Sequence, residues 1–162
     1  MSDVNIASLT VAMTDDIFEL MSLGGPYIRP RTSSDYWAYA TLFSSTCLVA
    51  TIDGHLAGAI IAFRSQSVPG DVFVQDVMVH PGFRRRGVAE ALVGSVHAVA
   101  HRWGCRRIYL TSEPDNQGAD STWRALGFVN APGDYAVEGV QVMRDFKGPG
   151  KDRAVYEHRL HS

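Results

Sequence analysis

Three consecutive arginines, Arg84 to Arg86, are followed by Gly87 and Ala89, and this basic segment of small residues carries the strongest chemical signal in the chain. It stands between a predicted strand and the start of a predicted helix. The first turn of a helix leaves backbone N–H groups without partners, and the helix dipole adds partial positive charge there. Gly87 leaves room for a phosphate at the backbone, Ala89 keeps the next contact small, and the arginines add mobile positive charge. The segment therefore predicts an anion site whose expected ligand is a pyrophosphate.

The residues alone leave two other interpretations of these arginines. One is a solvated loop. The other is a nucleic-acid-binding patch that includes four nearby residues, namely Arg102, Arg106, Arg107 and Tyr109. The chain carries 15 basic and 17 acidic residues, a net charge of -2. Because it also lacks a basic surface interleaved with aromatic residues, we expect no nucleic-acid partner.

The spacing Arg84-x-x-Gly87-x-Ala89 is neither the Gly-x4-Gly-Lys-Ser/Thr of a Walker loop nor the Gly-x-Gly-x-x-Gly of a Rossmann fold. It matches the Arg/Gln-x-x-Gly-x-Gly/Ala loop of the GNAT N-acetyltransferase superfamily. A second segment about 30 residues further on, Asn116-x-x-Ala119-x-x-x-Trp123-x-x-x-Gly127-Phe128, looks like the second signature of that family. With both signatures in order, the chain resembles the GNAT superfamily over most of its length.

The resemblance implies acetyl-CoA as the co-substrate. In such proteins the strand end at Val77, Met78 and Val79 is bulged, splays from its neighbour and pairs with the pantetheine arm, and the N–H near Val77 faces the acetyl oxygen. One such oxyanion donor is worth about 3 kcal/mol of barrier. Asn116 would contact the lower pantetheine arm, and the pyrophosphate would be wrapped by the residues of the first loop, namely Arg84, Arg85, Arg86, Gly87, Val88 and Ala89.

Acetylation needs a neutral amine, and an alkylamine with a pKa near 10 is neutral at pH 7 in only about one part in a thousand, a cost of roughly 4 kcal/mol. A base must therefore accept the proton. Related enzymes often hold Glu or His at the inward positions before the bulge, which by alternation are Phe73 and Gln75 here, and neither is basic. Asp76 is the nearest carboxylate, although strict alternation turns it to the other face unless the bulge shifts the phase. Glu113, just past the following strand, is the second candidate, and the choice stays open.

The family often has Tyr where this chain has Trp123, and an indole cannot protonate a leaving thiolate. We therefore expect the thiolate to leave unassisted or to take a proton from water. Trp123 would then pack beside the thioester.

In this family the acceptor pocket is built from the first helices and the late hairpin. Segment 34–50 faintly resembles the diaminobutyrate acetyltransferases, which points to a small diamine or amino acid. The expected substrate-binding residues are Asp35, Tyr36, Tyr39 and Gln75, with plain packing as the alternative for the aromatic cluster. Further candidates are Asp134, Glu138 and Asp145 for an ammonium group, and Arg29 and Arg31 for a carboxylate. The turn Gly148-Pro149-Gly150 is expected to be only a connector.

The elements that must position these residues follow from hydrophobic spacing and turn signals. The clearest helix shows Val88, Leu92, Val96, Val99 and Trp103 on one face. Predicted helices cover 15–22, 33–44, 87–103 and 116–126, and predicted strands cover 4–12, 47–52, 55–64, 71–79, 106–112, 136–143 and 154–160. The order β-α-α-β-β-β-α-β-α-β-β predicts an α/β (α+β) fold. The resemblance implies a mixed, mostly antiparallel central sheet with helices on both faces.

Length and composition limit the number of domains and the class of protein. At 162 residues and 17.7 kDa, with 46% hydrophobic and 20% charged residues, the chain is predicted to form one domain over 1–162. Cys47 and Cys105 are expected to be free thiols. His97 and His101 have the spacing of metal ligands with Glu90 on the same helical face, but that face is expected to be exposed, so no metal is predicted. We see no signal peptide or membrane-spanning stretch, so no membrane partner and a cytoplasmic location are expected.

The resemblance therefore predicts an acetyl-CoA-dependent N-acetyltransferase that acts on a primary amine of a small molecule by direct attack in a ternary complex. Two alternatives stay open. One is a non-catalytic acyl-CoA-binding sensor of the same fold. The other is a protein lysine or N-terminal acetyltransferase, for which an open acidic groove would be expected. A homodimer is compatible with either activity.

Overall fold

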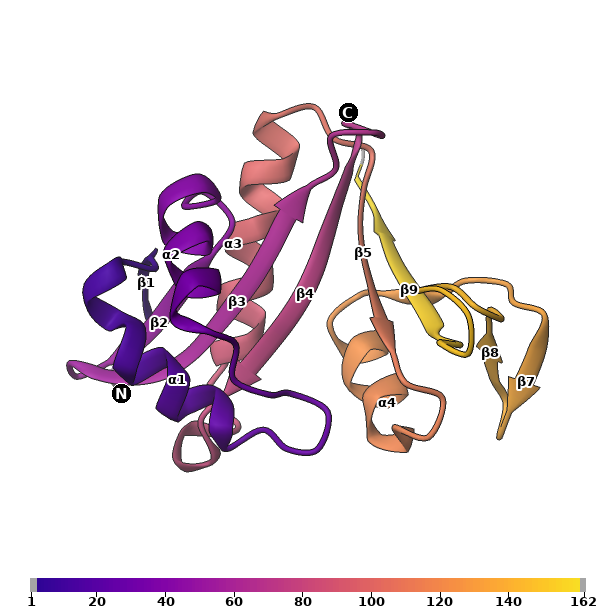
Figure 1. The fold of residues 1–162 in the computed structure, drawn as a ribbon, viewed down its shortest axis with the longest axis horizontal. Helices are drawn as coiled ribbons and strands as arrows, with labels where there is room; N and C mark the ends of the chain where they lie inside the picture. Colours follow the sequence, from indigo (N-terminus) through magenta and orange to yellow (C-terminus); the bar gives the residue numbers. More distant parts are fainter. Residues whose placement is uncertain (1–2, 161–162) are drawn as a thin grey trace.

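The computed structural model describes residues 3–160, so residues 1–2 and 161–162 of the predicted domain lie outside the described part. The main sheet has seven strands in the order β1-β2-β3-β4-β5-β9-β6, and β7 and β8 form a separate hairpin (Figure 1). The strands are β1 (Asn5–Ser8), β2 (Leu48–Ile52), β3 (His55–Arg64), β4 (Asp71–Val79), β5 (Arg107–Ser112), β6 (Val129–Asn130), β7 (Tyr135–Val137), β8 (Val140–Val142) and β9 (Ala154–Arg159). The helices are α1 (Thr14–Ser22), α2 (Ser33–Leu42), α3 (Val88–Arg102) and α4 (Gln117–Ala125), with short 3-10 turns η1 (Val11–Met13) and η2 (Pro81–Phe83).

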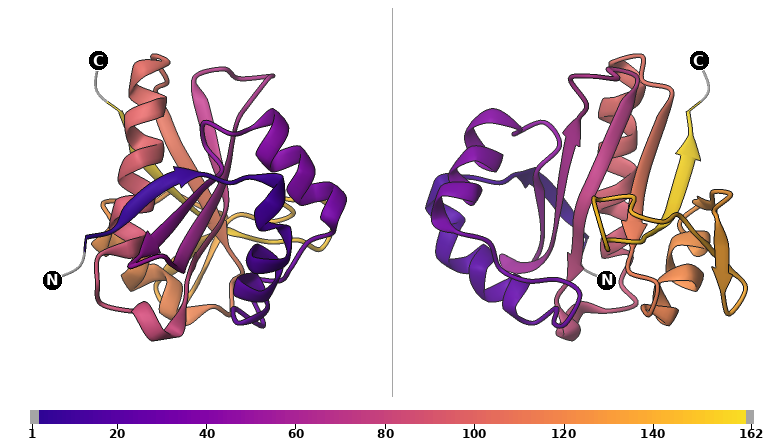
Figure 2. Two further views of the ribbon diagram at one scale, coloured as in Figure 1. Left: turned by 90° about the vertical axis from the view of Figure 1, so that its left-hand side faces the viewer. Right: turned by 45° about the vertical axis from the view of Figure 1, so that its right-hand side comes forward.

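The helices cover both faces of the sheet, as predicted. Helix α3 lies on one face, where Leu92 and Val96 are fully buried against the strands, and α1 and α2 lie on the other, where Ile17 and Tyr36 are buried (Figure 2). The mixed, mostly antiparallel α/β sheet is confirmed, since β4 and β5 form the parallel pair and the other neighbours in the main sheet run antiparallel. Among the helices of residues 3–160, none combines the length and apolar character needed to cross a bilayer.

The predicted strand over 136–143 is wrong as a single element. The chain turns back at Glu138 and Gly139, whose φ angles are 49° and 84°, so the segment forms the hairpin β7–β8. Two successive positive φ values are typical of the tight turns that join twisted antiparallel strands. The flanking valines favour a strand, and Glu138-Gly139 is not one of the Asn-Gly or Asp-Gly pairs that mark such a turn in a sequence.

Strands β4 and β5 pair only at one end. Their parallel pairing runs from Asp71 opposite Arg107 to Val74 opposite Leu110. Beyond these residues the two strands diverge, and β4 continues to Val79 paired with β3 alone (Figure 1). The sheet is therefore split down its centre, with the opening toward the carboxyl end of β4.

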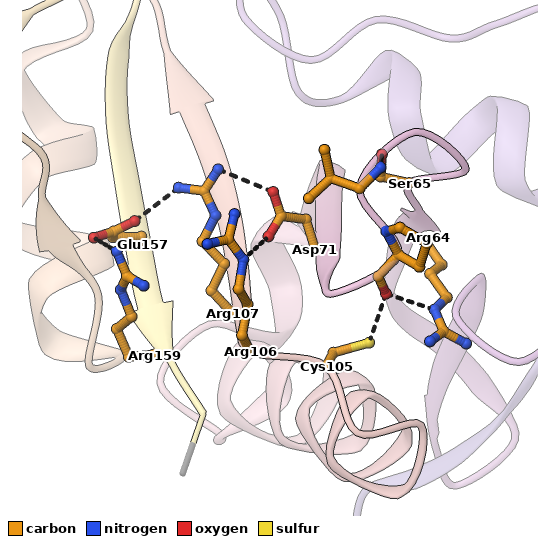
Figure 3. Close-up of polar contacts among 10 residues, drawn as sticks. Arg64, Ser65, Asp71, Cys105, Arg106, Arg107, Glu157 and Arg159 are labelled. Atoms are coloured by element: carbon orange, nitrogen blue, oxygen red, sulfur yellow. Dashed lines mark hydrogen bonds and ion pairs between the residues drawn. The ribbon is translucent and has the colours of Figure 1, made fainter. Parts of the chain in front are cut away.

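A cluster of charged side chains holds the closed end of this split together (Figure 3). The buried Asp71 on β4 accepts hydrogen bonds from Arg106 Nε at 3.0 Å and from Arg107 Nη2 at 3.1 Å. Arg107 on β5 also donates to Glu157 on β9 at 2.7 Å, and Arg159 lies 3.4 Å from the same carboxylate. One chain of ion pairs thus links three neighbouring strands where they are still paired.

Candidate functional site

The basic loop forms the N-terminal entrance to α3. Gly87 is the N-cap residue with φ 75°, and no side chain of residues 3–160 caps the helix. A Cβ at Gly87 would meet nothing within 4 Å, so the glycine is needed for its left-handed backbone rather than for space. Arg85 also has a positive φ, of 63°. Because α3 is 15 residues long, its first N–H groups and dipole make this loop a suitable anion site.

The arginines of the loop are exposed and turned to solvent rather than to other side chains of the sheet. The guanidinium of Arg86 lies 5.6 Å from the ring centroid of Phe83, and no ion pair within residues 3–160 engages Arg84, Arg85 or Arg86. Their charges are therefore available to an anion at the start of α3.

The open edge of β4 leads directly into this loop. Val77, Met78 and Val79 pair with β3, and their other edge faces the split, where β5 has already diverged. An extended ligand can pair with such an edge as an added strand. The structure therefore brings the predicted backbone segment and the predicted phosphate loop into one continuous surface.

The bulge lies two residues earlier than the resemblance implied. Ile61 on β3 is opposite Asp76 and Ala62 is opposite Val74, so Gln75 is the extra residue of β4. A bulge of one residue changes which face the following side chains take. Before it, Val74 packs in the cluster against α3, whereas after it Met78 belongs to the cluster under α1 and α2.

Asp76 changes faces because of this bulge. Strict alternation would place it with Val74, toward α3. Instead its carboxylate lies beside Gln75, whose amide Nε2 is 3.4 Å from Asp76 Oδ2 and donates to Tyr39 Oη at 3.0 Å. The bulge therefore shifts the alternation of side chains, which is the condition under which Asp76 could serve as the base. Its carboxylate lies on the face that α2 covers.

The environment of Asp76 makes it a stronger base than a free aspartate. The residue is 7% exposed, and burial raises the pKa of its carboxyl group. Arg31 opposes that rise, with its Nη2 3.6 Å from Asp76 Oδ2. The net direction of the pKa is upward because desolvation of the carboxylate outweighs the nearby positive charge.

Glu113 lies past the end of β5, on the other strand of the split. Its side chain is 43% exposed, and its Oε1 is 3.9 Å from Arg153 Nη2. With Asn116, the residue before α4, it lines a cavity of about 160 Å³. Of the two candidate bases, Asp76 is therefore the buried one and Glu113 the solvated one.

Trp123 has its polar atom in use. The indole Nε1 donates to Ser112 Oγ at 3.0 Å, and the ring packs edge-on against Phe128, with 6.2 Å between centroids. These contacts fix the indole beside Ser112, the last residue of β5. Its placement beside a thioester stays a prediction.

Several of the predicted acceptor residues form hydrogen bonds with neighbouring parts of the chain. Asp35 forms a capping box with Thr32, and these hydrogen bonds lower the pKa of its carboxyl group. Tyr36 is buried, and its hydroxyl accepts the N–H of Arg31 at 2.8 Å. The remaining candidates lie in turns or bond to nearby main-chain atoms: Arg29 to Pro26, Asp134 to Arg144, Asp145 to Gly150, and Glu138 in the β7–β8 turn.

Two charged residues were missed in the sequence. Lys147, next to the turn that was expected to be only a connector, places its ammonium group 5.0 Å from the ring centroid of Phe73 on β4. Arg153 follows that loop and faces Glu113. A lysine and an arginine in a late loop carry no local pattern, so only the folded chain could place them beside the split.

Other parts of the molecule offer less. A cavity of about 630 Å³ lies between α1 and the β2–β3 hairpin, and Asp16, Glu19 and His55 are among the residues that line it. Within residues 3–160, no group of three or more His, Cys, Asp or Glu side chains is placed to hold a metal ion. His97 instead packs against His158, with 5.1 Å between ring centroids.

Comparison with known proteins adds a family and a set of relatives. Residues 14–128 match the acetyltransferase (GNAT) family. The chain is 39% identical over 84 residues to mycothiol acetyltransferase of Kineococcus radiotolerans, covering 52% of this chain and 27% of that protein. It is 30% identical over 96 residues to L-2,4-diaminobutyric acid acetyltransferase of Nocardia farcinica, covering 59% of this chain and 50% of that protein. The chain thus spans about a quarter and a half of the lengths of these two relatives.

Among solved structures, the fold is similar to diaminobutyrate acetyltransferase EctA from Paenibacillus lautus, in complex with L-2,4-diaminobutyric acid and coenzyme A. The TM-score is 0.76 over 97% of this chain and 95% of that one, at 21% sequence identity. At this identity the likeness concerns the fold.

Proposed function

Because the chain belongs to the acetyltransferase (GNAT) family, we propose that it transfers an acetyl group from acetyl-CoA to a primary amine of a small molecule. The observation that carries the proposal is the continuity of the open β4 edge with the uncapped N-terminus of α3. A long, extended ligand that ends in a diphosphate fits such a surface, because the edge offers main-chain hydrogen bonds and the loop offers positive charge.

The residues present fit acetyl-CoA, which when bound supplies an activated acetyl thioester. Main-chain groups of Val77–Val79 would hold the extended arm, with Asn116 at its lower part. The N–H groups that open α3, together with Arg84–Arg86, would hold the diphosphate. Val77 N–H is the proposed donor to the acetyl oxygen, where one donor contributes about 3 kcal/mol.

Asp76 is the proposed proton acceptor for the amine. Its raised pKa makes it a better base than a solvated carboxylate, and its place on the α2 face of the open strand puts it beside the split. The neutral amine nitrogen then forms a bond to the acetyl carbon as the carbon–sulfur bond breaks, and the second proton of the nitrogen passes through water to the departing thiolate. We propose no side-chain acid for the sulfur, since Trp123 already donates to Ser112 and a thiol pKa of about 8.5 lets the thiolate leave at little cost.

The direct test is thiol release from acetyl-CoA in the presence of a panel of primary amines. The panel should contain diamines, amino acids with a second amine, aminoglycosides, and peptides with a free N-terminus or lysine. Release with small amines supports the proposal. Tight CoA binding without release on any amine favours the acyl-CoA sensor, and release with peptides alone favours protein acetylation.

Gly87→Glu tests the phosphate loop. A carboxylate at this position repels the diphosphate, and loss of hydrogen bonds to a charged group costs about 1.5–3 kcal/mol, so we expect CoA affinity by calorimetry to fall by roughly 10- to 100-fold. Gly94→Glu is the matched control, because Gly94 is exposed on the same helix with nothing within 4 Å of an added Cβ. Gly87→Ala separates backbone strain from charge and should weaken binding far less. Equal affinity in Gly87→Glu and Gly94→Glu would remove the loop assignment.

A further inference from the structure

Among residues 3–160, Lys147 has no ion-pair partner, and its ammonium group lies close to β4. The residue as a whole is exposed, but its ammonium group lies over the ring of Phe73, and no hydrogen bond or ion pair within residues 3–160 engages Nζ. Phe73 stands two residues before the bulge, and its ring packs against Tyr109 on β5, with 5.1 Å between centroids. The ammonium group therefore sits where β4 and β5 begin to diverge.

Four other charges act on Lys147 from different parts of the chain. They belong to Arg153, Asp76, Arg31 and Glu113. Burial, followed by the nearby Arg153, lowers the pKa of Lys147, and the carboxylates of Asp76 and Glu113 oppose that shift. Three cations and two carboxylates leave this cluster with a net charge of one positive unit. The excess matches a single carboxylate on a ligand better than a doubly charged phosphate.

The loop that carries Lys147 is built to hold its shape. Residues 143 and 153 pair as an isolated bridge, and the Lys147 N–H donates to the carbonyl of Lys151 at 3.2 Å. Asp145 accepts the N–H of Gly150 at 2.7 Å, which closes the turn from the other side. A preorganised loop holds its cation over the split at little entropic cost on binding.

Resting on the acetyltransferase function proposed above, we infer that the acceptor amine also carries a carboxylate, and that Lys147 binds this group with help from Arg31 and Arg153. The substrate class is an amino acid or a small amine bearing a free carboxylate, with its reacting amine toward Asp76. Lys147 is the specificity-determining residue because, within the part of the chain that the structure describes, it is the one of the three cations without a carboxylate in ion-pairing distance.

Pairs of acceptors that differ only in the carboxylate test the inference. Suitable pairs are L-2,4-diaminobutyrate with 1,3-diaminopropane, L-ornithine with putrescine, and L-lysine with cadaverine. We expect kcat/KM to favour the amino acid of the accepted pair by about tenfold or more, since a site that binds a charged group rejects the analogue without it. Lys147→Met should abolish that preference by raising the KM of the amino acid. The kcat/KM of the diamine and the KM of acetyl-CoA should stay unchanged.

Two further variants complete the design. Lys147→Arg keeps the charge and should retain most of the preference. Lys151→Met removes an exposed lysine from the same loop and should behave as wild type, and melting temperatures report that all variants are folded. The inference is overturned if the wild type turns over the diamines as well as or better than the amino acids. It is also overturned if Lys147→Met raises the KM of acetyl-CoA. Either result leaves the acetyltransferase function intact. Absence of thiol release with every amine class overturns both.

Discussion

At the scale of single residues, Asp76 is the group on which the proposed chemistry depends. Its carboxylate is buried beside Gln75 and faces Arg31, so its pKa reflects a balance between desolvation and a neighbouring cation. Glu113 has no comparable burial. The two carboxylates therefore differ in the property that matters for accepting a proton near neutral pH.

Asp76→Asn should lower kcat by roughly 10²- to 10⁴-fold, the usual contribution of a general base. In the wild type the rate falls as pH drops through the raised pKa of Asp76, because the carboxylate becomes protonated. The variant should lose that dependence and gain rate only as the amine itself deprotonates at alkaline pH. Glu113→Gln serves as the control. If Glu113→Gln loses the pH dependence and Asp76→Asn keeps it, Glu113 is the base.

At the scale of elements, β4 performs two tasks along its length. Its first half is fixed between β3 and β5, and its second half presents an open edge. The ion pairs around Asp71 link β4, β5 and β9 in the closed half. Burial opposes ionisation of Asp71, but the hydrogen bonds from Arg107 and Arg106 outweigh it and lower the pKa of the carboxyl group.

Asp71→Asn should reduce the free energy of unfolding by about 2 kcal/mol, less than for a fully buried pair because Arg106 is 57% exposed. The contribution of Asp71 is fully present above the ordinary aspartate pKa of about 3.9 and is lost as pH falls through the lowered folded-state pKa. Urea unfolding at pH 7 and pH 3 measures both effects. The exposed Asp3→Asn is the control, and an equal loss in the two variants would contradict a role for the ion pairs.

Local patterns predicted much of this architecture but not the features that depend on contacts between distant segments. The anion loop was predictable because arginines, a glycine and an amphipathic helix follow one another within a few residues of sequence. The position of the bulge was not, since it depends on how Ile61 and Ala62 of β3 align with β4. The place of Lys147 was not predictable for the same reason, because the contact with Phe73 joins residues that are far apart in sequence.

At the scale of the whole molecule, the layer of α3, on the side of the sheet opposite Asp76, contains a second titratable contact. His97 on α3 packs against His158 on β9, and within the described chain His158 Nδ1 is buried without a hydrogen-bond partner. Burial, followed by the charges of His158 and His101, lowers the pKa of His97. Protonation of His97 therefore opposes the packing of the long helix on the sheet.

Thermal stability should fall as the solution is acidified below about pH 6.5, the ordinary histidine value, because the unfolded chain then binds more protons than the folded one. The loss stops once the pH is below the lowered folded-state pKa of His97. His97→Gln should flatten this part of the profile, measured as melting temperature between pH 7.5 and 5. His101→Gln, exposed on the same helix, should leave it nearly unchanged, and an identical slope in wild type and His97→Gln would refute the assignment.

The extra residue at position 75 has one more consequence. From there to the end of β4, odd and even positions have exchanged sides. The face that each side chain takes therefore depends on the number of residues in the strand as well as on their types. Removing one residue at this point would send the carboxylate of Asp76 into the apolar layer beneath α3 and bring valines to the acceptor side. A shortened strand should therefore lose both solubility and turnover, whereas exchanging Gln75 for another residue of similar size preserves the parity of everything downstream.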